Sequence, residues 1–187
     1  MHPRVLLIST SYTNIESVIN DLTISLSAPS LELITAKDLS KNEILRAIEN
    51  SLYVFSIITD QWDSPLTFEE YQEVITEINL NKTPYWCVCD QKTIYARTIL
   101  NELKFLDNLS DLPEHDVKLL IDIYHTFIKH HEPEPSNRTG NWVHPYRTLE
   151  EISFYFVNQL VYAGHGLKNN YGVFYSLWCR RSPRVNL

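Results

Sequence analysis

Short apolar runs that alternate with stretches of helical spacing constrain the fold of this chain most. The runs lie at residues 5–9, 31–35, 53–58 and 84–89, and their lengths are typical of β-strands. The runs at 5–9 and 53–58 are apolar almost throughout, which is typical of strands covered by helices on both faces. Because strands and helices alternate, the pattern predicts a doubly wound α/β fold with a mainly parallel sheet.

Helix starts are indicated by capping boxes, in which a hydroxyl and a carboxylate three residues later bond each other's amides. The pairs are Thr13/Glu16, Ser40/Glu43, Thr67/Glu70 and Thr148/Glu151. Apolar residues recur at helical spacing behind each pair. We therefore expect helices to begin at these four places, with Pro29 ending the first of them.

The second half of the chain is less regular. Its expected elements are two helices, a fifth strand and a last helix, at 92–107, 115–129, 142–144 and from Thr148 onward. We interpret residues 1–163 as a single domain. Residues 164–187 are expected to form a C-terminal tail, with one strand at 173–177.

Composition excludes several classes of function. The net charge is −7, and an acidic surface repels nucleic-acid phosphates. No apolar run approaches the length of about 20 residues that spans a bilayer, and the first residues do not resemble a signal peptide. The three cysteines, Cys87, Cys89 and Cys179, argue against a disulfide framework. We expect a soluble, cytoplasmic protein that binds neither nucleic acid nor membranes.

In a parallel α/β sheet, ligands bind beyond the carboxyl ends of the strands. Two polar loops are expected there, at residues 9–13 after the first strand and 59–67 after the third. The candidate substrate-binding residues in these loops are Ser9, Ser11, Tyr12, Asp60, Trp62 and Ser64. Glu70 follows one turn into the next helix. His130 and His131 lack a third ligand at a suitable spacing, so no metal site is expected.

The stretch from Asn42 to Asp90 resembles a TIR-type domain or its TIR-related cousins. The resemblance depends on an Ile-Leu-Arg-Ala-Ile helix, an apolar strand at 53–58, and Ser64 followed six residues later by Glu70. Ser-Pro-Leu-Thr-Phe-Glu-Glu-Tyr, which ends at Tyr71, is similar to a Ser…Thr…Glu-Tyr pattern of that group. The Thr/Glu spacing is also similar to that of nucleoside deoxyribosyltransferases. The expected helices in 92–131 depart from a standard TIR domain.

The resemblance implies a reaction class. TIR enzymes cleave the nicotinamide–ribose bond of NAD, and deoxyribosyltransferases cleave a base–sugar bond. It implies Glu70 as the catalytic carboxylate, with NAD or a related nucleotide as substrate and no separate cofactor. It also implies an effector or signalling role, for example in prokaryotic antiviral defence, with self-association or a partner protein. A carboxylate beside the anomeric carbon can stabilise the positive charge that develops there.

The neighbouring Glu69 is the rival of Glu70. On a helical wheel Glu69 points away from the apolar face of its helix, whereas Glu70 lies on the flank of that face. Glu70 can also be explained as the third residue of a capping box and nothing more. Trp62 can either stack on a base or cover the strand ends.

Two other functions stay open. One is a catalytically silent TIR-like module that self-associates or binds a nucleotide signal. The other is a flavodoxin-like electron-transfer protein, in which residues 9–13 would bind the flavin phosphate and Asp90, Gln91 and Tyr95 would form the second flavin loop. A phosphate loop usually needs glycine for close backbone approach, and no glycine precedes Gly140. We therefore rank flavin binding below the other two.

Overall fold

A five-stranded sheet, parallel throughout, forms the centre of the computed structural model, which describes residues 3–81, 83–94 and 143–162. Its spatial order is β2-β1-β3-β4-β5. The strands are β1 (Arg4–Ser9), β2 (Glu32–Thr35), β3 (Ser51–Ile58), β4 (Tyr85–Asp90) and β5 (Val143–Tyr146). This confirms the predicted doubly wound α/β class, including a fifth strand near residues 142–144.

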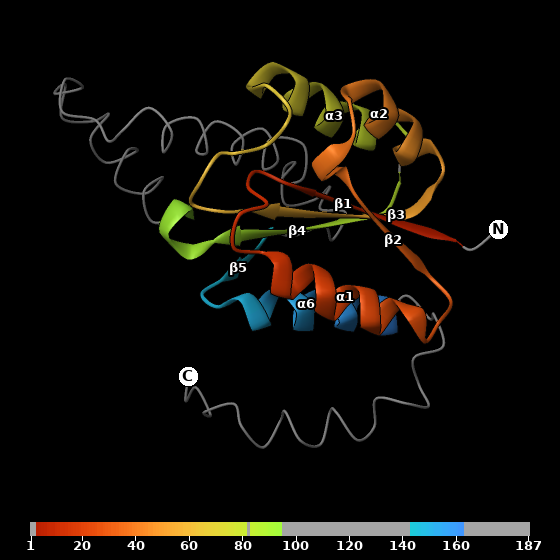
Figure 1. Ribbon diagram of the computed structural model, residues 1–187, viewed down its shortest axis with the longest axis vertical. Coiled ribbons are helices and arrows are strands. Elements are labelled where there is room, and N and C mark those ends of the chain that lie inside the picture. The colour runs from red at the N-terminus through yellow and green to blue at the C-terminus, as the bar shows by residue number, and fades with distance from the viewer. Residues whose placement is uncertain (1–2, 82, 95–142, 163–187) are drawn as a thin grey trace, which may run out of the picture.

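Helices cover both faces of the sheet (Figure 1). They are α1 (Glu16–Ser27), the short 3₁₀ helix η1 (Ala36–Asp38), α2 (Lys41–Glu49), α3 (Phe68–Leu80) and α6 (Leu149–Tyr162). α2 and α3 pack together on one face, and α1 and α6 pack together on the other. Of the helix expected at 92–107, residues 92–94 are described and are helical. The rest of it, the helix expected at 115–129, the division at residue 163 and the strand at 173–177 lie outside the described residues. None of the described helices is both long enough and apolar enough to span a bilayer.

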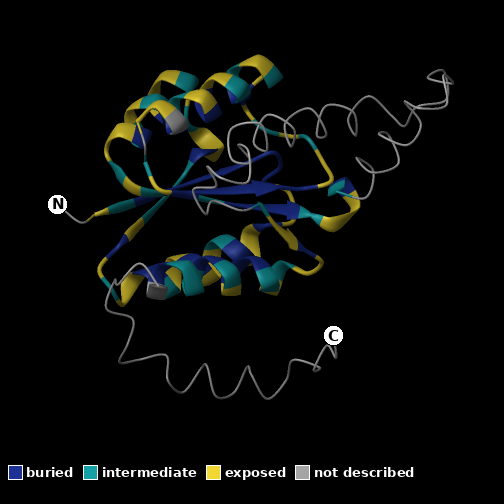
Figure 2. Cartoon of the chain, turned by 180° about the vertical axis from the view of Figure 1, so that it is seen from behind, coloured by how far each residue is buried: buried dark blue, intermediate teal, exposed yellow. Residues whose placement is uncertain are grey.

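The core lies where the sequence is most continuously apolar. The side chains from Val5 to Ser9 in β1 and from Val54 to Ile58 in β3 are all buried. Successive side chains of a strand point to opposite faces, so complete burial requires a helical layer on each side. Figure 2 shows this as dark strands between helices whose outer sides are exposed. Cys87 and Cys89 of β4 are buried thiols, and burial raises the pKa of Cys87 to about 12.

Two of the four predicted capping boxes are confirmed. At the start of α2, the Glu43 carboxylate accepts a hydrogen bond from the Ser40 amide at 2.9 Å. At the start of α3, the Thr67 amide donates to Glu70 Oε2 at 3.0 Å, and the Glu70 amide donates to Thr67 Oγ1 at 3.3 Å. These reciprocal bonds satisfy amides that have no partner within the helix.

The other two boxes are not formed as predicted. α1 begins after Ile15, without a side-chain cap, because the Thr13 hydroxyl donates to Asp63 in a distant loop instead. At the start of α6, the Glu151 carboxylate accepts from the Arg147 amide at 2.8 Å, one residue earlier than expected. At the start of α1, the tertiary contact between Thr13 and Asp63 thus replaces the local capping box.

A series of ring contacts connects α6 to the sheet. Phe55 of β3 stacks on Phe156 of α6 with centroids 4.2 Å apart and planes 4° apart. Trp86 of β4 contacts Phe55 at 5.7 Å and Tyr53 at 4.9 Å. Offset aromatic pairs contribute about 0.5–1.5 kcal/mol beyond the area they bury. The rings therefore attach a helix from late in the sequence to strands from its first half.

We expect Phe55→Ala to lower the free energy of unfolding by about 3–5 kcal/mol, because it leaves a cavity in a fully buried site and removes the stack with Phe156. Urea denaturation followed by circular dichroism measures the change. Leu52→Ala in the same strand is the control, since Leu52 is 43% exposed, and its cost should stay below about 1 kcal/mol. Equal losses from both variants would contradict the burial described for β3.

Candidate functional site

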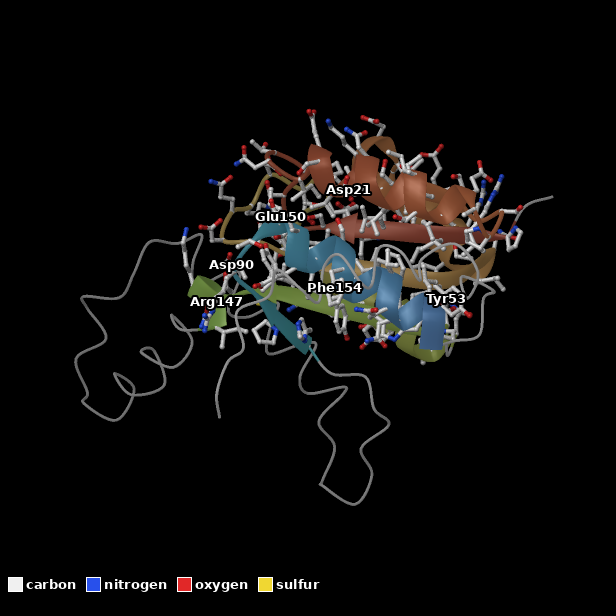
Figure 3. All side chains as sticks on the ribbon, turned by 90° about the horizontal axis from the view of Figure 1, so that it is seen from below. Asp21, Tyr53, Asp90, Arg147, Glu150 and Phe154 are labelled. Atoms are coloured by element: carbon white, nitrogen blue, oxygen red, sulfur yellow. The ribbon has the colours of Figure 1, made fainter. Side chains whose placement is uncertain are left out.

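The loops that follow β1 and β3 meet at the carboxyl edge of the sheet, as predicted. The two strands pair in parallel with Ser9 opposite Ile57, so their loops begin side by side at the same edge of the sheet. The Asp63 amide then donates to the Thr10 carbonyl at 2.9 Å, which joins the two loops directly. Figure 3 shows this end of the sheet beside Asp90 and Arg147, with Tyr53 at the opposite end.

Three of the predicted binding residues are inside the first loop rather than on its surface. Ser9, Ser11 and Tyr12 are 1%, 2% and 5% exposed. The Ser9 hydroxyl lies within hydrogen-bond distance of the Ser11 and Ile57 carbonyls, and the Ser9 amide donates to the Tyr12 hydroxyl at 3.2 Å. In this conformation they shape the loop, and their role as substrate contacts stays a prediction.

Threonines that the sequence analysis did not select connect the ends of three strands. Thr10 Oγ1 lies 3.1 Å from Thr59 Oγ1 and accepts the Thr59 amide at 3.0 Å. Thr93, after β4, donates its hydroxyl to the Thr59 carbonyl at 3.2 Å. All three are buried. Because buried polar groups need partners, these bonds fix the edge of the sheet on which any site is built.

Asp63 bonds both loops at this edge, and no motif in the sequence marked it. Its carboxylate accepts hydrogen bonds from the Tyr12 amide at 2.7 Å, the Thr13 amide at 3.3 Å and the Thr13 hydroxyl. Together with its own amide bond to Thr10, this clamps the loop after β3 onto the loop after β1. The only signal in the sequence was an aspartate in a loop at the carboxyl edge, which Asp60 shares.

The hydrogen bonds to Asp63 determine its titration. Partial burial raises the pKa of its carboxyl group, but the Thr13 and Ser11 hydroxyls and the Tyr12 and Thr13 amides outweigh burial and hold the pKa below the ordinary value of 3.8. Hydrogen bonds to the charged form have this effect because they stabilise the ion relative to the acid. Asp63 is therefore ionised at neutral pH.

Asp60 belongs to a second cluster, over β3, β4 and β5. Its carboxylate forms an ion pair with Lys92 Nζ at 2.9 Å. The Lys92 amide donates to Asp90 at 2.7 Å, and Arg147 Nε donates to Gln91 Oε1 at 2.6 Å. Partial burial, followed by the charge of Asp60, raises the pKa of Asp90. An exposed ion pair such as Asp60–Lys92 contributes little to stability.

Ser64 and Trp62 lie in the segment that connects β3 to α3. The Ser64 hydroxyl accepts the Leu66 amide at 3.3 Å and so shapes the turn before the helix. The ring of Trp62 packs edge-on against Tyr71, with centroids 5.6 Å apart, and against Phe68 at 6.4 Å. These contacts let Trp62 cover the strand ends, and its stacking on a ligand stays a prediction.

Glu70 is half-buried, whereas Glu69 is exposed, which confirms the helical-wheel prediction. The charge of Glu70 contributes to a raised pKa of Lys41 on α2, after the larger effect of Glu73, which pairs with Lys41 at 2.6 Å. Glu70 Oε2 accepts the Thr67 amide, and a carboxylate has several further acceptor positions.

Metal and flavin ligation can be tested against these contacts. Within residues 3–81, 83–94 and 143–162, no three His, Cys, Asp or Glu side chains gather closely enough to hold a metal ion. A flavin phosphate in the loop after β1 would need amides such as those of Tyr12 and Thr13, and these already donate to Asp63. The carboxylate competes with any such phosphate.

Comparison with known proteins gives similarities to solved structures alone. No family model matches the chain, and no curated protein sequence matches it. A chain from the crystal structure of the RPS4 and RRS1 TIR domain heterodimer is 12% identical, with a TM-score of 0.47, and the match covers 87% of this chain and 98% of that one. A similarity of this size assigns neither a family nor an activity.

We expect Asp63→Ala to lower the free energy of unfolding by about 1 kcal/mol at pH 7, a value reduced for the exposure of the carboxylate. The pKa of Asp63 is lowered in the folded state. The stability that its carboxylate gives the fold is therefore fully present above the pKa of the unfolded chain, near 4, and is lost as the pH falls through the lower pKa of the folded state. The gap between wild type and variant should therefore close in acid. Denaturation in urea at pH 7 and pH 3 measures it.

Asp60→Ala is the matched control, because it removes a carboxylate of the same loop that forms only an exposed ion pair with Lys92 among the described residues. Its cost at pH 7 should be within about 0.5 kcal/mol of zero. If Asp63→Ala and Asp60→Ala are equally mild at pH 7, the clamp contributes nothing to stability.

Proposed function

We propose that this protein cleaves or rearranges the N-glycosidic bond of NAD or a related nucleotide, with Glu70 as its catalytic carboxylate. In this proposal it acts in the cytoplasm as an effector or signalling domain, for example in antiviral defence. The observation that supports it most is the position of Glu70. It is half-buried on the first turn of α3, just beyond the carboxyl end of β3, where folds of this class bind ligands.

The chemistry requires a fixed negative charge. When the bond between the nicotinamide nitrogen and the ribose breaks, its electron pair leaves with nicotinamide and the anomeric carbon becomes positively charged. A carboxylate held in place stabilises that charge without reorganising. Water then adds to the carbon in a hydrolase, or a nucleophile of the same molecule adds in a cyclase. The Thr67 amide, 3.0 Å from Glu70 Oε2, holds the proposed catalytic carboxylate in one orientation.

The segment that connects β3 to α3 would position the substrate. Asp60 and Ser64 present polar groups there, and Trp62 presents a half-buried ring. Asp60 is held by Lys92 and Ser64 by its own turn, so neither needs to be ordered when a ligand binds. Prior ordering of this kind lowers the entropic cost of placing a substrate.

A catalytically silent interaction module is the second candidate, and one observation favours it. The Thr67/Glu70 box already gives Glu70 a structural role, and Ser9, Ser11 and Tyr12 are buried in their loop. Such a module would work through self-association, a partner protein or a bound nucleotide signal. Turnover of substrate separates the two candidates.

We expect Glu70→Gln to reduce the release of nicotinamide from NAD by about 100-fold or more, because it removes the charge that stabilises the transition state. Glutamine can still accept the Thr67 amide through its side-chain oxygen, so the melting temperature should change by no more than a few degrees. Chromatography of concentrated protein incubated with NAD measures the product. Ser64→Ala and Trp62→Ala should mainly raise KM.

Glu69→Gln is the matched control, since it removes the same charge one residue away on the exposed side of α3, and it should keep full activity. If Glu70→Gln is as active as wild type, the assignment of Glu70 is wrong. If wild type releases no nicotinamide at any concentration and Glu70→Gln melts several degrees lower, the interaction module becomes the better explanation.

A further inference from the structure

The groups that bind the Asp63 carboxylate have the composition of an anion site. The amides of Tyr12 and Thr13 and the Thr13 hydroxyl all donate to it. Adjacent amides that converge on one point form the concave sites in which proteins hold phosphate and other anions. The next residue, Asn14, has a φ of 69°, a left-handed conformation that turns the chain within this loop without glycine.

Ser11 supplies a second, independent observation. Its side chain is 2% exposed, and Ser11 Oγ has no hydrogen-bond partner of normal geometry among the described residues. The hydroxyl nevertheless lies close enough to the Asp63 carboxylate to lower its pKa. A buried hydroxyl without a good partner is costly. It lies in the same loop as the Tyr12 and Thr13 donors, and a ligand with more acceptor atoms than a carboxylate would give it a partner.

We propose that Ser11, Tyr12 and Thr13 form a phosphate-binding site, and that Asp63 occupies it as an internal substitute until a phosphate displaces its carboxylate. The ligand class is a nucleotide phosphate or diphosphate, and this part of the inference rests on the proposed function. Two anions cannot share these donors, because their charges repel each other at such short range. Binding of phosphate therefore requires the Asp63 side chain to leave.

Displacement of Asp63 has a consequence for Glu70. The clamp holds the segment that carries Trp62 and Ser64 and leads into α3. When phosphate replaces the carboxylate, the side-chain part of this clamp is released, while the backbone bond from Asp63 to Thr10 can remain. Phosphate binding at one loop thus loosens the segment next to the proposed catalytic residue, so nucleotides are distinguished from nucleosides before any bond is broken.

Charge near the site predicts a weak wild-type affinity. Asp38 of η1 lies close enough to Tyr12 for its charge to act on the pKa of that side chain, as does Asp63 itself. The donors available to a phosphate are neutral amides and hydroxyls. Removal of the Asp63 charge should therefore have a large effect on phosphate affinity, because it removes both a competitor and a repulsive charge.

The test is titration of wild type, Asp63→Asn and Asp63→Ala with inorganic phosphate, AMP and adenosine by calorimetry. Asp63→Ala should bind phosphate and AMP about tenfold more tightly than wild type. Asp63→Asn loses the charge but keeps an acceptor for the Tyr12 amide, so its affinity should fall between the two. Adenosine, which lacks phosphate, should bind all three proteins equally. Stronger binding of AMP than of phosphate would identify a nucleotide as the ligand.

Two further variants make the result specific. Glu69→Gln removes an exposed carboxylate outside the site and should leave phosphate affinity unchanged. Thr13→Val in the Asp63→Ala background should abolish most of the gain, because it removes a donor. Equal phosphate affinity in wild type, Asp63→Asn and Asp63→Ala would overturn the proposal. Binding is measured without turnover, so the absence of nicotinamide release would contradict the proposed function and leave this result intact.

Discussion

The pairing of β1 with β3 is the constraint on which the other features depend. Because Ser9 lies opposite Ile57, the two buried strands end together, and their loops emerge side by side on one edge of the sheet. Hydrogen bonds of side chains then join the two loops. Thr10 Oγ1 lies within hydrogen-bond distance of Thr59 Oγ1, and the Asp63 carboxylate accepts the Tyr12 amide. A shift of one residue in this register would turn the buried side chains of β1 to the opposite faces and would separate these partners.

The fold could be predicted from sequence because its signals are local, whereas the edge of the sheet depends on distant contacts. The Ser40/Glu43 box needs only its own four residues and formed as predicted. Thr13 offered the same motif, but its hydroxyl bonds Asp63, 50 residues away. Nothing local distinguishes Asp63 from Asp60. The sequence predicts that both aspartates lie near the site, and only the contacts in the folded protein show that Asp63 holds its two loops together.

Glu70 and Asp63 both hold backbone amides at this edge, and they illustrate how architecture and chemistry compete for the same groups. Glu70 bonds one amide of its own helix and retains acceptor capacity. Asp63 bonds two amides and a hydroxyl from another loop. A group with few bonds to the protein is more available for a reaction. A group with many bonds must be displaced before its donors can serve a ligand.

The ring contacts between α6 and the sheet have a consequence for how the chain folds. Phe55 meets Phe156, and Cys87 of β4 pairs with Val143 of β5, so a long stretch of sequence must close into a loop before these contacts form. Loop closure costs entropy and slows folding. β1 to β4 can assemble from nearer neighbours, which leaves one edge of β4 without its partner strand for a time. Such an edge can accept the same strand from a second molecule, so exchange of β5 and α6 between two copies is the misassembly to which this topology is most susceptible.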